Sequence, residues 1–507
     1  MLLSELLKVL PEAKVEGNTD LEVRNLAYDS RKVKAEGLFV AIDGNKIDGH
    51  RFIDQAILNG AQAVVVQKNG LSLPSSVTQV TVKRSRQALS RLSACFFGQP
   101  ASKLHLIAIT GTNGKTTTAY LVESILKAAG FSVGVLGTVS YRYGSKVKPA
   151  PVTTPESLDL QGLLAEMVQE KITHVVMEVS SHALDQGRLG DIYFDKAVFT
   201  NLSQDHLDYH KDMEDYFQAK AKLFQQHLKA NGKGLAIINR DDPYGQRLWN
   251  EWPGSKKDFG IENKPAYFPF EVHSDLNGIQ GRIQTPQRDY TIKSPLIGRY
   301  NMYNILAAWA VGEGFLLEGE IIRKGIESVT LVPGRMEPVP NKKGLTILVD
   351  YSHKPEALRS ALLSLREYVG GRILTVFGCG GDRDPYKRPL MGRIAGGLSH
   401  LTIVTSDNPR SEDPIKIIQD IEQGLKEQGS PYVDRKNLKE IPKSPGYTSV
   451  PNRREAIFLA VSLAQPGDVI LIAGKGHETY QLLGSKILEF DDREEARKAL
   501  EAIDVQH

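Results

Sequence analysis

The stretch LIAITGTNGKTTTAYL, residues 106–121, decides the fold. An apolar run typical of a buried strand leads into a glycine-rich turn, and Lys115 and Thr116 then open a helical pattern. In such a turn successive backbone N–H groups face one concavity and the helix N-terminus adds partial positive charge, so phosphates bind there. The sequence therefore predicts a strand, a phosphate loop and a helix in sequence.

The same residues predict a triphosphate site. Lys115 would hold the β- and γ-phosphates, and the Thr116 hydroxyl would reach a magnesium ion. The spacing departs from the general phosphate loop, because Ile109 stands five positions before Gly114. We expect the nucleotide to contact the loop residues Gly111, Thr112, Asn113, Gly114, Lys115, Thr116 and Thr117.

Hydrophobic patterning divides the 507 residues into three parts. Residues 1–99 alternate short apolar strands with a helical segment, which predicts a small α/β domain. Residues 100–332 show long βαβ alternation, which predicts a central, doubly wound, mostly parallel sheet carrying the ATP site. Residues 333–507 repeat apolar strands followed by helices or glycine-rich loops, which predicts a Rossmann-like domain. The expected fold class is α/β with three domains.

Composition argues against several classes of function. The 63 Lys+Arg against 60 Asp+Glu leave a formal net charge of +3, and no basic run resembles a nucleic-acid footprint, so nucleic acid is not an expected partner. Cys95 and Cys379 are too few for a disulfide framework, which fits a reducing cytoplasm. Residues 1–14 mix acids with apolar residues and predict a short amphipathic helix. No stretch is long enough to span a bilayer, so membrane contact is not expected.

Polar residues after the next strands extend the predicted site. Glu178 ends the strand HVVME, where its carboxylate could complete a magnesium shell or could be a satisfied polar group. The loop of residues 201–210 is dense in histidines and carboxylates and invites a zinc hypothesis, but its spacing is not that of the usual zinc sites. Lys220 and Lys222 follow on an amphipathic helix, where each alone would be a solvated lysine.

Two loops need separate interpretation. GNKIDG, residues 44–49, contains the N-K-x-D pattern of guanine-binding switches, but there the pattern follows the phosphate loop and here it precedes it. We interpret it as a loop of the first domain. In TSDNPRSEDP, residues 405–414, Arg410 follows a buried strand, where a planar bidentate donor suits capture of a carboxylate or phosphate. A solvated loop arginine is the alternative.

Ten motifs occur in the order found in Mur ligases, and the chain resembles this family over essentially its whole length. They are GTNGKTTT, MEVSSHALDQGR, NLSQDHLDYH, YFQAKAKLF, GRYNMYNILAA, VPGRMEPV, VDYSHKPEAL, FGCGGDRDPYKRPLM, SDNPRSEDP and AGKGHETYQ. The resemblance implies a cytoplasmic ATP-dependent amide ligase of bacterial cell-wall synthesis. It would join meso-diaminopimelate to the D-glutamate of UDP-N-acetylmuramoyl-L-alanyl-D-glutamate through an acyl phosphate. The implied cofactors are ATP and magnesium, and we expect a monomer.

The resemblance also implies roles for residues of the ATP site. Lys115, Lys220, His206 and Glu178 would be catalytic. The metal would be held by Thr116, Glu178, His206 and Lys220, with Lys220 carbamylated to N6-carboxylysine. Asn301 would lie near adenine, and Arg335 and Asp350 would close on the nucleotide.

For the other two substrates the resemblance implies two further sets. The UDP-sugar peptide would contact Tyr28, Ser30, Asn45, Lys46, Ile47, Thr153, Thr154, Ser180, Gln186 and Arg188. Diaminopimelate would contact Arg383, Asp407, Asn408, Pro409, Arg410, Gly474 and Glu478. Within this set Arg410 would bind the far carboxylate of diaminopimelate.

Three alternatives stay open at this point. A lysine-adding ligase of the same family would share everything except the carboxylate-binding residue at position 410. A folylpolyglutamate synthetase shares the ATP domain but does not resemble this sequence in its first domain. A non-enzymatic nucleotide switch would have no use for the ligand loops of the third domain.

Overall fold

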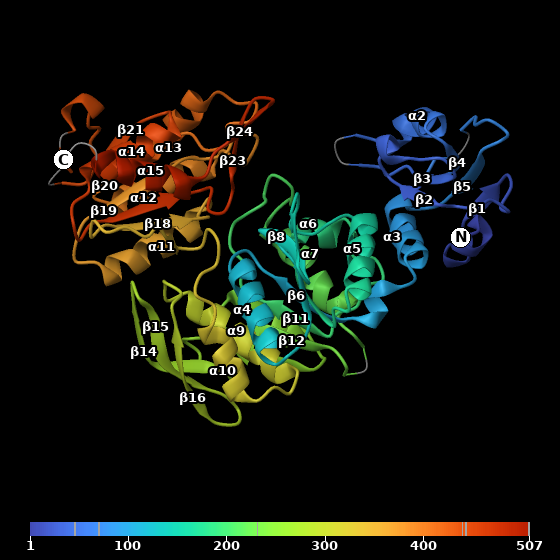
Figure 1. Cartoon of the computed structure of the whole chain (residues 1–507), viewed down its shortest axis with the longest axis horizontal. Coiled ribbons are helices and arrows are strands. Elements are labelled where there is room, and N and C mark those ends of the chain that lie inside the picture. Colours follow the sequence, from blue (N-terminus) through green and yellow to red (C-terminus); the bar gives the residue numbers. More distant parts are fainter. Residues whose placement is uncertain (45–46, 69–70, 231, 439, 442–443, 505–507) are drawn as a thin grey trace.

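The computed structural model describes residues 1–44, 47–68, 71–230, 232–438, 440–441 and 444–504. It confirms the predicted α/β class with three domains. The N-terminal and C-terminal domains lie on opposite sides of the central domain (Figure 1). The boundaries after residues 99 and 332 stay predictions. No helix in the described ranges is both long and apolar enough to cross a membrane.

The N-terminal domain is a five-stranded sheet in the order β1-β5-β4-β3-β2. Its strands are β1 (Lys14–Glu16), β2 (Asn25–Ala27), β3 (Gly37–Val40), β4 (Ala61–Val66) and β5 (Thr78–Thr81). Its helices are α1 (Leu3–Leu6), α2 (Ile53–Leu58) and α3 (Ser85–Phe96). The amphipathic helix expected near the N-terminus is only α1, extended by a single 3-10 turn (Leu7–Val9).

The central domain is built on an eight-stranded sheet in the order β13-β12-β11-β6-β10-β7-β8-β9. The strands are β6 (His105–Thr110), β7 (Val133–Leu136), β8 (Ser140–Tyr143), β9 (Lys146–Pro149), β10 (His174–Glu178), β11 (Lys196–Phe199), β12 (Leu235–Asn239) and β13 (Lys256–Phe259). Only β8 and β9 run antiparallel to their neighbours. The carboxyl ends of β11, β6 and β10 therefore lie side by side, as a ligand site in a parallel sheet requires.

Helices cover both faces of the central sheet. They are α4 (Lys115–Ala128), α5 (Ser157–Gln169), α6 (Ser181–Asp185), α7 (Met213–His227), α8 (Pro243–Glu251), α9 (Asn301–Gly314) and α10 (Gly319–Glu327). Leu164 of α5 and Phe224 of α7 belong to the core of one face. Ile125 of α4 and Trp309 of α9 belong to the core of the other. The sheet is doubly wound, as predicted.

A three-stranded antiparallel sheet within the central domain was not predicted. It comprises β14 (Phe268–Asp275), β15 (Gly278–Gln284) and β16 (Asp289–Ser294). Leu276 and Asn277 form the turn between β14 and β15, and Gly278, the first residue of β15, has φ +122°. The Asn277–Gly278 pair in the sequence lies one position beyond the centre of this turn. This sheet packs Ile279 and Ile292 against the helices of the central domain and reaches the C-terminal domain through Leu276.

The C-terminal domain has a six-stranded sheet in the order β17-β18-β22-β19-β20-β21, antiparallel only at β17. Its strands are β17 (Glu337–Pro338), β18 (Thr346–Asp350), β19 (Ile373–Phe377), β20 (Leu401–Val404), β21 (Gly446–Ser449) and β22 (Val469–Ala473), followed by the hairpin β23 (Tyr480–Leu483) and β24 (Lys486–Glu489). Its helices are α11 (Pro355–Tyr368), α12 (Lys387–Leu398), α13 (Pro414–Glu427), α14 (Arg453–Leu463) and α15 (Asp492–Asp504). The predicted Rossmann-like arrangement is confirmed.

A buried ion pair joins α14 and α15 beside the end of β22. Both Arg453 and Asp492 are fully buried, and Nε and Nη2 of Arg453 each lie 2.7 Å from a carboxylate oxygen of Asp492. Nη2 also donates to the Ala473 carbonyl at 3.0 Å. The pair therefore fixes the strand end from which the loop at Gly474 departs.

We expect Asp492→Ala to lower the free energy of unfolding of the C-terminal domain by about 3–5 kcal/mol, because it leaves a buried guanidinium without its counter-charge. Glu455→Ala is the matched control, since Glu455 pairs with Arg435 at a half-exposed site and its loss should remove under about 1 kcal/mol. Urea unfolding of both variants measures the difference. Equal losses would contradict the assigned role of burial.

Candidate active site

The phosphate loop joins β6 to α4 and needs glycine at two positions. Gly111 has φ +144° and Gly114 has φ +84°. A Cβ on Gly111 would lie 1.9 Å from Oγ1 of Thr200, and one on Gly114 would lie 2.4 Å from Oδ1 of Asn304. The loop backbone thus packs directly against the end of β11 and against α9.

Residues that follow β11 form hydrogen bonds to the phosphate loop on the side away from the cavity. Thr200 Oγ1 donates to the Asn113 carbonyl at 2.6 Å, and the Asn113 N–H donates to Asn201 Oδ1 at 2.9 Å. The Thr112 N–H donates to the Asn201 carbonyl at 2.9 Å. These bonds account for the backbone groups on one side of the loop, and its other side faces a cavity.

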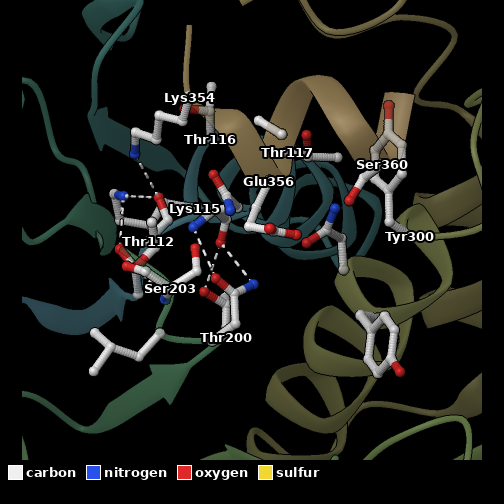
Figure 2. Close-up of a pocket in the computed structure, with 18 of the residues that line it drawn as sticks. Thr112, Lys115, Thr116, Thr117, Thr200, Ser203, Tyr300, Lys354, Glu356 and Ser360 are labelled. Carbon is white, nitrogen blue, oxygen red and sulfur yellow. Dashed lines mark hydrogen bonds between the residues drawn. The ribbon is translucent and has the colours of Figure 1, made fainter. Parts of the chain in front are cut away.

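That cavity has a volume of about 520 Å³ and is lined by both the central and the C-terminal domain (Figure 2). The predicted residues that it brings together are Gly111, Thr112, Asn113, Gly114, Lys115, Thr116, Thr117, Thr153, Glu178, Ser180, His206, Lys220, Arg335 and Asp350. Residues from loops after β6, β10, β11 and β18 therefore meet in one concave site.

Two lysines bind the carbonyl groups of the loop, Lys220 being buried and Lys115 partly buried. Nζ of Lys115 donates to the carbonyls of Gly111 and Thr112 at 2.8 and 3.0 Å, and Nζ of Lys220 donates to the Gly111 carbonyl at 3.0 Å. Burial, followed by the charge of Lys354, lowers the pKa of Lys115 to about 8. Burial, followed by the charges of Lys115 and Lys354, lowers the pKa of Lys220 well below its ordinary value, which favours a neutral amine.

Glu178 is buried at the end of β10 and accepts hydrogen bonds on both oxygens. Thr116 Oγ1 and Thr138 Oγ1 each donate to Oε2 at 2.9 Å, and the Thr138 N–H donates to Oε1 at 2.9 Å. Nη2 of Arg335, from the C-terminal domain, donates to Thr116 Oγ1 at 3.2 Å. A hydroxyl and a carboxylate thus meet at the first turn of α4, where oxygen ligands suit magnesium.

His206 has the left-handed φ of +56° in the loop between β11 and α7. Its Nε2 lies 3.0 Å from Oδ2 of Asp205, and the same oxygen lies 2.6 Å from Nζ of Lys354. Burial lowers the pKa of His206, although the Asp205 carboxylate opposes this shift. Within the described ranges, no three His, Cys, Asp or Glu side chains are arranged to hold a metal ion.

Asn301 does not line the cavity. Its Nδ2 donates to the Ile297 carbonyl and its Oδ1 accepts from Nδ2 of Asn304, both at 2.8 Å, at the buried start of α9. Tyr300, which precedes the expected position, lines the cavity instead, as do Tyr303 and Asn304, which follow it within one turn. The motif GRYNMYNILAA contained all of them, but no periodicity singled them out.

The residues predicted to bind the UDP-sugar peptide fall into two groups. In the central domain, Thr154 Oγ1 donates to the Glu178 carbonyl at 2.9 Å and accepts from the Ser180 N–H at 3.0 Å. Nη1 of Arg188 donates to the Thr154 carbonyl at 3.0 Å, and its Nε donates to Gln186 Oε1 at the same distance. This hydrogen-bond network begins at the carboxyl end of β10, where the Glu178 carbonyl accepts from Thr154.

The second group lies in the N-terminal domain. Tyr28 Oη donates to Oδ2 of Asp159 on α5 at 2.5 Å, so this residue already joins the two domains. Ser30 is buried and Ile47 is exposed. Asn45 and Lys46 lie outside the described residues.

The predicted amino-acid site lies at the carboxyl ends of β20 and β22. Asn408 Nδ2 donates to Oε2 of Glu478 at 2.8 Å, and the fully buried Lys475 donates to Asn408 Oδ1 at 3.1 Å. Lys475 Nζ also lies 3.3 Å from Glu478 and 3.5 Å from Asp407. Burial, followed by the Asp407 charge, raises the pKa of Glu478. Lys475 was not predicted, although it stands between Gly474 and Glu478.

Arg410 contacts a backbone carbonyl of a neighbouring loop. Its Nη1 donates to the Gly381 carbonyl at 2.7 Å, and its backbone φ is +51°. Among the residues that the structure describes, no carboxylate forms an ion pair with it. Arg383 is exposed in the same loop region, and the Pro409 carbonyl accepts from the Glu412 N–H at 3.0 Å.

Family models match three segments of the chain. The model described as "Mur ligase family, catalytic domain" matches residues 22–97, "Mur ligase middle domain" matches 109–312, and "Mur ligase, glutamate ligase domain" matches 334–476. The chain belongs to the Mur ligase family. This Mur ligase is 47% identical over 507 residues to the UDP-N-acetylmuramoyl-L-alanyl-D-glutamate--2,6-diaminopimelate ligase of Geobacter sulfurreducens, with 99% of each chain covered.

Solved structures extend the comparison. A structure of a ligase bearing that same name is 31% identical to this Mur ligase, with a TM-score of 0.69 and coverage of 99% of this chain and 100% of the other. A MurF ligase from Thermotoga maritima in complex with ADP is 19% identical, with a TM-score of 0.63 and coverage of 96% and 99%. At this level of identity, the similarity to the MurF ligase shows a shared fold only.

We expect Gly111→Ala to weaken nucleotide binding about tenfold or more, because the added Cβ must displace Thr200 or the loop. Gly130→Ala is the matched control. Gly130 also has a positive φ, +84°, but nothing lies within 4 Å of the point that its Cβ would occupy. It should lose about 1–2 kcal/mol of stability and keep its nucleotide affinity. Calorimetric titration with ADP tests both, and equal affinities would refute the packing argument.

Proposed function

We propose that this Mur ligase uses ATP to join meso-diaminopimelate to the D-glutamate of UDP-N-acetylmuramoyl-L-alanyl-D-glutamate. The observation that carries the proposal is the shared cavity, in which the phosphate loop, Glu178 and Lys220 face Arg335 and Asp350 of the C-terminal domain. The names of the near full-length relatives support the choice of substrates. We further propose a cytoplasmic monomer acting on small molecules only.

The first chemical step would be phosphoryl transfer. A carboxylate oxygen of D-glutamate attacks the γ-phosphorus of ATP, the bond from that phosphorus to the β–γ bridging oxygen breaks, and ADP leaves. Lys115 and the loop N–H groups would stabilise the charge on the transferring group. The amine of diaminopimelate then attacks the acyl phosphate, loses a proton, and phosphate leaves as the amide forms. Closure by Arg335 would exclude water from the acyl phosphate.

Magnesium fits the oxygen donors present at the first turn of α4. The Thr116 hydroxyl and the Glu178 carboxylate already touch, and His206 and Lys220 line the same cavity. These four residues would hold the ion, which when bound would neutralise charge on the β- and γ-phosphates.

Lys220 would serve as a metal ligand only after modification. An ammonium repels a cation, whereas the neutral amine favoured by burial can attack carbon dioxide, lose a proton and become a carbamate anion. Such an N6-carboxylysine would place an oxygen ligand at a position that the unmodified side chain cannot fill.

The test of the proposal is ADP release by the wild-type protein supplied with the UDP-dipeptide and one amino acid at a time. We expect release with meso-diaminopimelate, little with L-lysine, and none without the UDP-dipeptide. Lys115→Ala should keep the fold and lose turnover, because its amine contacts only the loop. Greater ADP release with L-lysine than with meso-diaminopimelate would show that the protein is a lysine-adding ligase. ADP release with a folate substrate would favour a folylpolyglutamate synthetase.

We expect Lys220→Ala to abolish ligation, with partial recovery on adding acetate or formate, whose carboxylate replaces the lost anionic ligand. Lys222→Ala is the matched control, two residues along α7, where the ammonium pairs with Asp185 at 2.8 Å on a more exposed side. It should keep activity and show no response to acetate. Labelled bicarbonate followed by NMR detects the carbamate directly, and a fully active protein with an unmodified Lys220 would refute it.

Arg410 is expected to set the preference between diaminopimelate and lysine. If its guanidinium binds the far carboxylate, its removal should cost about 2–5 kcal/mol of binding, or tens to thousands of times in kcat/KM at about 1.4 kcal/mol per tenfold. Arg410→Ala should therefore lose efficiency with diaminopimelate and gain little with lysine. Arg435→Ala, at a distant exposed pair, is the control. An unchanged ratio of the two kcat/KM values would show that Arg410 only braces the Gly381 loop.

A further inference from the structure

Helix α11 of the C-terminal domain contacts the central domain at both ends. At its start, Nζ of Lys354 lies 2.6 Å from Oδ2 of Asp205 and donates to the Thr112 carbonyl of the phosphate loop at 3.3 Å. At its end, Tyr368 Oη lies 2.7 Å from Ser274 Oγ of β14 and accepts from the Arg299 N–H at 2.9 Å. The helix is thereby fixed across the domain boundary, and so is the residue that precedes it.

Lys354 points into the phosphate cavity. Figure 2 shows its side chain reaching from the start of the helix toward Thr112 and Lys115. The side chain of Lys354 is 11% exposed and that of Asp205 is 15% exposed, so the ion pair is largely removed from solvent. A lysine from another domain thus reaches the loop that the central domain builds for phosphates.

Three lysine amines converge on two carbonyl groups. Lys115 binds the carbonyls of Gly111 and Thr112, Lys220 binds that of Gly111, and Lys354 binds that of Thr112. The ammonium groups of Lys115 and Lys354 repel each other inside the protein, so this pair is favourable where an anion of several charges will bind beside them. A carbonyl oxygen is a weak acceptor for an ammonium compared with a phosphate oxygen.

We propose that Lys354 is a catalytic residue supplied by the C-terminal domain, which contacts the transferring phosphoryl group while Asp205 holds its ammonium beside the phosphate loop. This inference rests on the proposed ATP-dependent ligation. Lys354 would first contact the terminal phosphoryl group of a nucleoside triphosphate. After transfer it would contact the same phosphoryl group in the acyl phosphate. The anchor at Tyr368 makes the placement of this cation depend on domain docking.

The competing explanation is that Lys354 only docks the two domains through Asp205. Tyr368→Phe separates the two explanations, because it removes a hydroxyl that joins the same helix to the central domain without touching the cavity. Docking alone predicts similar effects from both ends of α11. Contact with the phosphoryl group predicts an effect of Lys354 that depends on the γ-phosphate.

The experiment compares wild type, Lys354→Met, Lys354→Gln, Lys354→Arg and Tyr368→Phe in the full chain with magnesium. Affinities for ADP and for a non-hydrolysable ATP analogue are measured by calorimetry, and kcat by ADP release with the UDP-dipeptide and diaminopimelate. We expect both neutral variants to weaken analogue binding by about tenfold or more and ADP binding far less, with a larger loss in kcat. Lys354→Arg should restore part of the analogue preference. Tyr368→Phe should change both affinities by the same factor.

A neutral variant at position 354 that keeps the wild-type ratio of analogue to ADP affinity would overturn the inference, and so would a ratio shifted equally by Tyr368→Phe. Thermal unfolding of each variant shows whether it is folded. If one of the two neutral variants does not fold, the other still allows the ratio of affinities to be measured. If the wild type itself released no ADP with the UDP-dipeptide, the proposed function would fail instead. The two failures are therefore distinguishable.

Discussion

The active site depends on two carbonyl groups of the turn at residues 111–114. Gly111 and Thr112 direct these carbonyls at amines from three separate segments of the chain, and the turn keeps this shape because Gly111 and Gly114 pack without a Cβ against Thr200 and Asn304. A bulkier turn would move the carbonyls. The buried Lys220 amine would then lose its carbonyl acceptor, which is costly in a low-dielectric interior, whereas Lys354 would keep its ion pair with Asp205.

Sheet order explains why those segments meet. β6 lies between β10 and β11, so the phosphate loop, Glu178 and the Thr200–Asn201 corner emerge next to one another at one edge. The central domain alone supplies the residues proposed to bind phosphate and metal, but it leaves the cavity open on one side. Arg335 and Lys354 close that side from the C-terminal domain, which is why the chemistry of this cavity belongs to two domains rather than one.

Local sequence patterns were sufficient to predict most of the fold. Apolar strands followed by glycine-rich turns predicted the two parallel sheets, and the motif order placed Lys115, Glu178, Lys220 and Arg335 in one site, where the structure brings them together. The sheet β14 to β16 was missed because its strands are half exposed and mix polar with apolar residues.

The remaining gaps in the predicted site have a tertiary origin. Lys354 meets Thr112 across 242 positions, and Lys475 meets Asn408 across 67, so no local pattern announces either contact. Asn301 illustrates a finer limit, because neighbouring positions on a helix face different directions. At the start of α9, Tyr300 lines the cavity, whereas the next residue, Asn301, donates to the buried Ile297 carbonyl.

The backbone conformation at Arg410 limits which residues could take over its proposed role in amino-acid selection. Arg410 is held at φ +51° by its own N–H on the Leu482 carbonyl, at 3.2 Å, and by the Gly484 N–H on its carbonyl, at 2.7 Å. Left-handed backbone is tolerated best by glycine, asparagine and aspartate and worst by β-branched residues. By fixing this backbone conformation, the hairpin β23–β24 therefore limits which residues can replace Arg410. If Arg410 has its proposed role, a small polar residue could replace it without a change in the hairpin, whereas valine or isoleucine at this position would require the hairpin to change as well.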